Sequence, residues 1–144
     1  MANVNTYSSK SVTITIAGNL LTGYADGDFC ETSQDEDAFK KVIGADGTGS
    51  RSRNANEGGV VKVTLQSTSP SNDVLSALAN NDRLLVTGIG TVLVKDASGR
   101  TVESAQAGWV KKIPPSKFAK DQGTNAWEID CIKLTRFVGG NNPN

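Results

Sequence analysis

The sequence has 144 residues, no histidine, and equal numbers of basic and acidic side chains, 15 of each. This length predicts a single domain, 1–144, with a true hydrophobic core. The lack of histidine removes most catalytic and zinc-binding arrangements, and a neutral chain is poorly suited to tight nucleic-acid binding. The opening residues are polar and no apolar run is long enough to span a bilayer, so we expect neither a leader peptide nor a membrane partner.

The first half of the chain predicts three strands and a helical turn. Strict alternation over 11–16 predicts a strand with one apolar face. Shorter strands are expected at 20–24 and 28–32, joined by a turn. Ser33 to Glu36 match a capping box, so a short helical turn through Phe39, Val42 and Ile43 is expected before Gly44.

Residues 44–59, GADGTGSRSRNANEGG, hold no aliphatic or aromatic side chain larger than alanine. Connections this long without internal structure are uncommon in compact domains and are usually functional or disordered. We therefore expect a long extended loop that finds its contacts outside its own domain.

The second half predicts one helix among strands. Several N-cap candidates and a proline at 69–73 precede the apolar stripe of Val74, Leu75 and Leu78, which predicts a short helix ending at 80–82. Strands are expected at 59–66, 84–89, 91–94, 101–110 and 126–138, with a hairpin turn at 96–99. In the last strand the apolar side chains change face after Cys131, which indicates a bulge or a passage between sheets.

These elements predict a mainly β fold, a β-sandwich or partly closed barrel with one short flanking α-helix and a long extended loop. Residues 1–10 and 139–144 are read as polar terminal arms. Residues 1–82 carry ten acids and six bases, and residues 83–144 carry nine bases and five acids. This bipolarity is either chance scatter over a solvated surface or a basis for self-association.

No catalytic, cofactor-binding or metal-binding site is predicted. Asp26 and Asp28 imitate the first ligands of a calcium loop, but Cys30 stands where the third ligand should be, which favours a solvated acidic face. Residues 44–51 lack the glycine spacing and the lysine of a phosphate-binding loop. Cys30 and Cys131 are expected to be small buried residues, not a disulfide. An enzyme is therefore not expected.

Three segments together resemble a known family. They are GYADGD at 23–28, GADG at 44–47 followed by Arg51 and Arg53, and LQSTSPSNDVL at 65–75. In this order they resemble the tail tube proteins of bacteriophages with contractile tails. The resemblance covers residues 10 to about 136.

The resemblance implies a structural protein of the virion tail, made in the host cytoplasm. Its hexameric rings would stack into a tube inside a contractile sheath, and its partners would be further copies, the sheath protein, and baseplate and tail terminator proteins. Genomic DNA would pass through the lumen without specific binding. An extended loop would reach the adjacent ring, so Arg51 and Arg53 are predicted to bind acids of a neighbouring subunit, with Asp46 and Glu57 as reciprocal candidates.

Two other classes stay open. A related ring-forming protein, such as a secretion-system tube or a tail terminator, would share these features. A β-sandwich binding module for carbohydrate or protein would need exposed aromatic platforms, and Trp109 and Trp127 both stand at plausible core positions.

Overall fold

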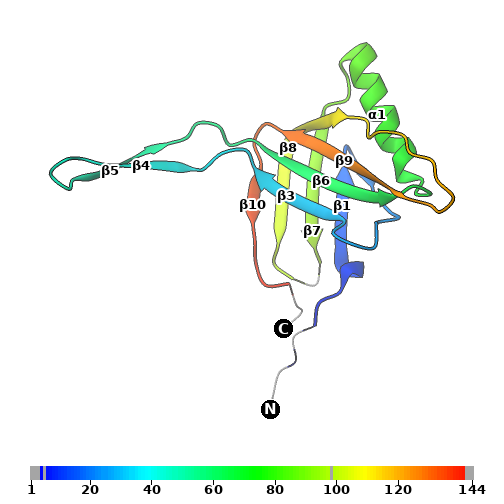
Figure 1. Cartoon of the computed structure of the whole chain (residues 1–144), viewed down its shortest axis with the longest axis horizontal. Coiled ribbons are helices and arrows are strands. Elements are labelled where there is room, and N and C mark those ends of the chain that lie inside the picture. The colour runs from blue at the N-terminus through cyan, green and yellow to red at the C-terminus, as the bar shows by residue number, and fades with distance from the viewer. Residues whose placement is uncertain (1–3, 5, 98, 142–144) are drawn as a thin grey trace.

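A computed structural model describes residues 4, 6–97 and 99–141. The described part is mainly β with one α-helix, as predicted (Figure 1). The strands are β1 (Val12–Ile16), β2 (Asn19–Leu20), β3 (Cys30–Gln34), β4 (Phe39–Ile43), β5 (Gly49–Arg53), β6 (Gly59–Gln66), β7 (Gly90–Asp96), β8 (Val102–Lys112), β9 (Thr124–Cys131) and β10 (Thr135–Phe137). The helix α1 spans Ser71–Leu85, and a short 3₁₀ turn, Ser9–Ser11, precedes β1.

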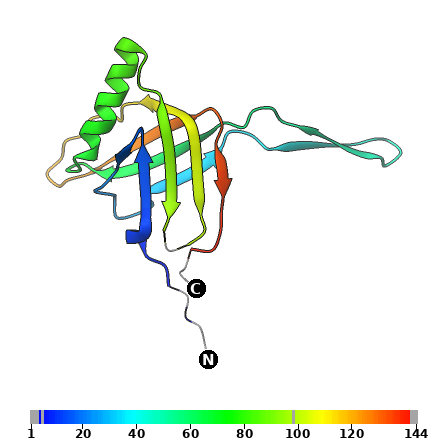
Figure 2. The ribbon, with the colours of Figure 1, turned by 180° about the vertical axis from the view of Figure 1, so that it is seen from behind.

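Eight strands form one folded antiparallel sheet in the order β2-β1-β7-β8-β9-β6-β3, with β10 paired to β8. Strand β8 belongs to both layers, because its first residues pair with β10 and its last residues pair with β9. Figures 1 and 2 show β3, β6 and β9 crossing over β1, β7 and β8, with the helix at one end. This is the expected sandwich, closed along one side by the shared strand.

The core lies between the two layers. Strict alternation in β1 and β6 sends every second side chain inward, and Ile14, Val61, Val63 and Leu65 are fully buried. Trp127 of β9 is buried beside them. Burial of these side chains supplies the main stabilisation of the domain.

A bulge in β8 interrupts the alternation of its side chains between the two faces of the sheet. Val92 of β7 pairs with Ala105, whereas Gly90 pairs with Gly108, so β8 carries one extra residue between these points. Such an insertion reverses the side-chain alternation that follows it. Ala105 and Val110 therefore both point into the core, and Trp109, which the sequence placed at a plausible core position, is only half-buried.

The helix is longer than predicted, and the strand expected at 84–89 is wrong. Helix α1 continues to Leu85, and Val86 ends it in the left-handed region at φ 55°. Asparagine and aspartate lower the stability of a helix only slightly at interior positions, so the helix continues through residues 80–82. The first residue of the helix is bound to the segment after β2, because the Ser71 Oγ accepts a hydrogen bond from the Thr22 backbone N–H at 2.8 Å.

Other boundaries also differ from the prediction. The strand expected at 20–24 is reduced to β2 and a single bridge between Tyr24 and Leu65. The long strand expected at 126–138 is two strands, because the chain bends after Cys131 and returns to pair with the first part of β8 as β10. Both cysteines are free, as predicted, with Cys131 buried and Cys30 partly buried.

The helical turn expected at 33–43 is wrong. Strand β3 runs to Gln34, and residues 39–43 form strand β4, which pairs with β5. The apolar spacing of Phe39, Val42 and Ile43 fits a helical face, but none of these side chains reaches the core. Without that packing a helix of one or two turns has little support, and the cross-strand partner decides the conformation.

Candidate functional site: an exposed hairpin arm

The most distinctive feature of the molecule is a hairpin that projects from the body, with β4 and β5 along its length (Figures 1 and 2). We call residues 35–58 the arm. It leaves the fold at the end of β3 and returns at the start of β6, where Gln34 pairs with Gly59 and the Asp35 N–H donates to Gly58 O at 3.1 Å. The segment read from the sequence as an unstructured loop, 44–59, is thus one half of a paired arm.

Polar contacts hold the base of the arm. The Glu36 carboxylate accepts hydrogen bonds from the side-chain amides of Asn54 at 3.1 Å and Asn56 at 2.9 Å. These amides stabilise the ionised form and lower the pKa of Glu36. The Asn54 backbone N–H donates to Ala38 O at 2.8 Å. The arm therefore has a defined exit direction without any apolar packing.

At the tip, residues 44–48 form the hairpin turn. Gly44 N–H donates to Thr48 O at 2.8 Å, and Gly47 takes a left-handed φ of 89°. The Asp46 carboxylate accepts from the Thr48 N–H at 3.0 Å, which lowers the pKa of Asp46. Asp46, predicted as a contact to a neighbour, thus has a turn-forming role in its own chain.

All ten residues of β4 and β5 are exposed. Directly paired residues share a face of a hairpin, so the pairs Phe39 with Arg53 and Lys41 with Arg51 lie on the same side. The Arg51 guanidinium lies 4.0 Å from the centre of the Phe39 ring. One side of the arm is therefore basic and aromatic. We call these four residues the basic face.

The basic face is poorly neutralised within its own chain. Two like charges directly opposite each other, as Lys41 and Arg51 are, destabilise a strand pair. Arg53 has an ion pair with Glu57 at 3.6 Å, and Glu57 also approaches Lys133 at 3.7 Å, but these groups are well exposed. Exposed pairs of this kind contribute little. The structure brings Arg51 and Arg53 to one face, places Asp46 in the turn at the tip, and pairs Glu57 with Arg53 in an exposed contact.

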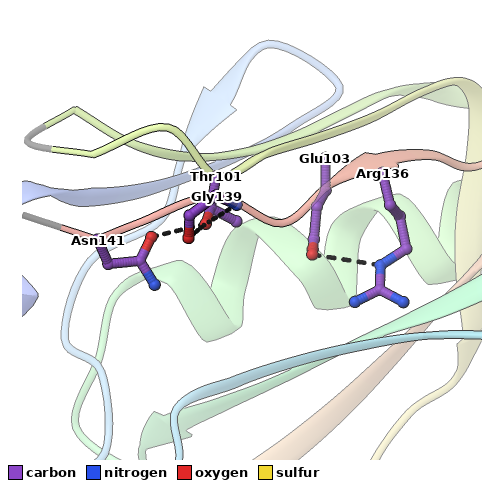
Figure 3. A network of polar contacts seen from close by, with 5 residues as sticks. All are labelled: Thr101, Glu103, Arg136, Gly139 and Asn141. Carbon is purple, nitrogen blue, oxygen red and sulfur yellow. Dashed lines mark hydrogen bonds and ion pairs between the residues drawn. The ribbon is translucent and has the colours of Figure 1, made fainter.

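A second polar network fixes the C-terminal segment to β8 (Figure 3). Arg136 Nε donates to the buried Glu103 carboxylate at 3.3 Å. The Thr101 hydroxyl donates to the Asn141 side-chain oxygen at 2.6 Å and accepts from the Gly139 N–H at 3.1 Å. Residues 139–141 of the expected terminal arm are therefore bonded to the body, and 142–144 lie outside the described residues. The pairing of Glu103 with Arg136 was missed because it depends on the β8–β10 register.

Among the residues that the structure describes, no group of three or more histidine, cysteine, aspartate or glutamate side chains is placed to hold a metal ion. No helix among these residues is long and apolar enough to cross a membrane.

Comparison with known proteins places the chain in a family. The sequence model of the family described as "Bacteriophage PhiTE tail tube protein" matches residues 4–139. The chain belongs to this family. A relative in Pseudomonas phage KPP10, "Structural protein ORF10", is 34% identical over 145 residues, which cover 95% of this chain and 84% of that protein. This chain is therefore a structural protein related to phage tails.

Two solved structures share the fold of this PhiTE-family chain. One is a chain of the sheath/tube terminator of PVC, an extracellular contractile injection system, in its extended state. It has a TM-score of 0.65 and 8% identity and covers 95% of this chain and 100% of that one. The other is the anti-feeding prophage cap, described as the AFP tube terminating cap, with a TM-score of 0.63 and 8% identity over 96% and 95% of the two chains. At this identity the likeness concerns the fold alone.

Proposed function

We propose that this chain is the tail tube subunit of a phage with a contractile tail. Six copies form a ring, rings stack into a tube inside the sheath, and the genome leaves through the lumen. The observation that carries the proposal is the match to the tail tube family over residues 4–139. The sheath, baseplate and terminator proteins are the other partners, and the subunit stays in the virion tail.

The sheet topology supports ring formation. In the layer β1-β7-β8-β10, only the two-residue strand β2 covers β1 on one side, and no further strand of the described residues covers β10 on the other. In the layer β3-β6-β9 one side continues into β8, so that layer has a single free edge. A sheet that continues from copy to copy needs two free edges. The first layer meets this need with four strands.

Simple geometry gives the size of such a ring. Four strands from each of six copies, spaced about 4.8 Å apart, make a circumference of roughly 115 Å and a diameter of about 37 Å before tilt. That opening is wide enough for a DNA duplex.

The outward face of this layer suits passage of DNA. Its side chains are Thr13 and Thr15 of β1, Thr91, Leu93 and Lys95 of β7, Val102, Ser104 and Gln106 of β8, and Thr135 and Phe137 of β10. Lys95 is the one charged residue among them. Phosphate contacts would hold the cargo back, so a nearly uncharged wall favours transport over binding.

The arm supplies the contact between subunits. Its basic face, with Arg51 and Arg53, is proposed to bind carboxylates of a neighbouring copy, and Asp46 and Glu57 are proposed as reciprocal contacts. The exposure of every residue of β4 and β5 supports this, because an isolated two-stranded hairpin is marginally stable in water.

Electron microscopy of the purified protein, compared with a variant lacking the arm, tests the proposal. Residues 37–55 are replaced by Asn-Gly, which joins two ends that are already hydrogen-bonded through Asp35 and Gly58. The native chain is expected to form long tubes. The armless chain is expected to keep the circular dichroism spectrum of the body and to form no tubes. Regular tubes from the armless chain would contradict the role of the arm.

A tube terminator is the second candidate, favoured by the fold similarity to the terminator of PVC and the AFP cap. It would form discrete single rings that do not stack in the same microscopy experiment. A monodisperse monomer would contradict both candidates.

A further inference from the structure

A groove opens between the two layers, beside the start of β3. Its volume is about 790 Å³, and its lining includes Val12 and Val94 from one layer and Cys30 of β3 from the other. Tyr24 and Phe29, also in the lining, stack with ring centres 4.7 Å apart. This groove gives a partner an aromatic surface to pack against.

Every charged side chain that lines the groove is acidic. They are Asp26, Asp28, Asp96 and Glu103. Glu103 is engaged with Arg136. Asp26 and Asp28 stand exposed at the mouth, and among the described residues no ion pair reaches either carboxylate. The groove therefore presents anionic groups at its mouth beside an aromatic pair.

The arm has the complementary character. Residues 39–53 contain Lys40, Lys41, Arg51 and Arg53 against the single acid Asp46. Three of these cations share the basic face with Phe39. An aromatic ring flanked by guanidinium groups matches a groove that offers aromatic rings flanked by carboxylates.

The two surfaces lie at opposite ends of β3. The arm leaves after Gln34, the last residue of β3, whereas Asp26 and Asp28 precede Cys30, its first residue. Figures 1 and 2 show the arm directed away from the body in both views. An arm that projects away from its own groove is available to the groove of another molecule.

We propose that the groove between the layers is the receptor for the arm, so that the basic face of one copy binds beside Asp26 and Asp28 of a second copy. This inference rests on the proposed self-assembly and names its acceptor surface. Donor and acceptor are different patches, so the contact is heterologous and repeats from copy to copy. Contacts of this type produce closed rings or open filaments.

Charge exchange tests the pairing. Arg51→Glu and Asp28→Lys are each expected to raise the protein concentration needed for assembly by about tenfold or more, because each places like charges together. The two changes in one chain restore opposite charges and are expected to bring that concentration back to within about threefold of the native value. Lys120→Glu and Asp121→Lys make the same charge changes in an exposed loop outside the groove and serve as matched controls.

Disulfide trapping gives a second readout in a Cys30→Ser background. A chain with both Arg51→Cys and Asp28→Cys is expected to form a ladder of covalent oligomers on oxidation. An equimolar mixture of two chains that each carry only one of the introduced cysteines, beside the buried Cys131, is expected to stop at the dimer. Native tubes or rings without a ladder, and with no charge rescue, would overturn the groove as acceptor while leaving self-assembly intact. A native chain that never associates would overturn the proposed function and this inference together.

Discussion

We predict that replacing Asn72, whose side chain joins helix α1 to strands β6 and β9, destabilises the domain. Its amide donates to Gln66 O at 2.9 Å and to Ser69 O at 3.0 Å, and its oxygen accepts from Trp127 Nε1 at 2.9 Å. Trp127 is only 2% exposed, so its N–H has little access to water once this acceptor is removed. Asn72→Ala thus leaves one buried donor unpaired and two carbonyls less well satisfied.

The magnitude follows from these contacts. An orphaned buried N–H costs about 1–3 kcal/mol, and each neutral hydrogen bond that water can partly replace adds about 0.5–1 kcal/mol. Alanine recovers about 0.5 kcal/mol through its higher helix propensity. Asn72→Ala is therefore expected to lower the free energy of unfolding by about 1.5–4.5 kcal/mol and Tm by about 5–15 °C.

Urea unfolding followed by tryptophan fluorescence and circular dichroism measures this loss. Asn72→Asp keeps the acceptor for Trp127 but sets a carboxylate oxygen, in place of a donor, against the Gln66 and Ser69 carbonyl oxygens, so it is expected to recover only part of the loss. Asn81→Ala, at an exposed position on the same helix, is the matched control and is expected to be neutral or slightly stabilising. If Asn72→Ala unfolds within about 0.5 kcal/mol of Asn81→Ala, the network does not hold the helix as argued.

Two further predictions concern a close backbone approach and the thiols. A Cβ at Gly59 would lie 2.6 Å from both Leu134 Cδ2 and the Ser33 carbonyl oxygen, whereas a Cβ at Gly27 would meet nothing within 4 Å. Gly59→Ala is expected to cost about 1–3 kcal/mol and Gly27→Ala to stay within about 0.5 kcal/mol, measured by Tm, and equal values would contradict the steric argument. Burial raises the pKa of both Cys30 and Cys131 to about 11, so alkylation by iodoacetamide at pH 8 is expected to be far slower in the native chain than in urea. Since the folded state binds these protons more tightly than the unfolded state, stability should fall as pH rises from about 9 to 11, and native thiols that react as fast as unfolded ones would refute the burial of both groups.

The sequence predicts an element well where a local pattern and the core agree. The strands at 11–16 and 59–66 could be predicted because their alternation matches a buried face, complete in β6 and complete but for the half-buried Val12 in β1. The helix was predicted because its cap candidates and apolar stripe lie together. Strand β4 was missed because the spacing of Phe39, Val42 and Ile43 fits a helix equally well, and only its pairing with β5 decides.

The basic face of the arm could be predicted only in part, because only part of it follows from a local sequence pattern. Arg51 and Arg53 are two residues apart on one strand, so any extended conformation places them on one face. Phe39 and Lys41 join that face only through the β4–β5 register, which no local pattern contains. The Asp46-Gly47 dipeptide is typical of a hairpin turn and is the local signal from which the turn at the tip of the arm could have been predicted.

The hydrogen bond between Asp35 and Gly58 at the root of the arm has a consequence for sequence tolerance. Everything beyond it can change in length or composition without removing an atom from the core, since no side chain of β4 or β5 is buried. The arm can therefore change under selection for partner binding while the body keeps its fold. The root is also a position at which a foreign peptide can be inserted without disturbing the core, provided that the arm and its basic face are kept for assembly.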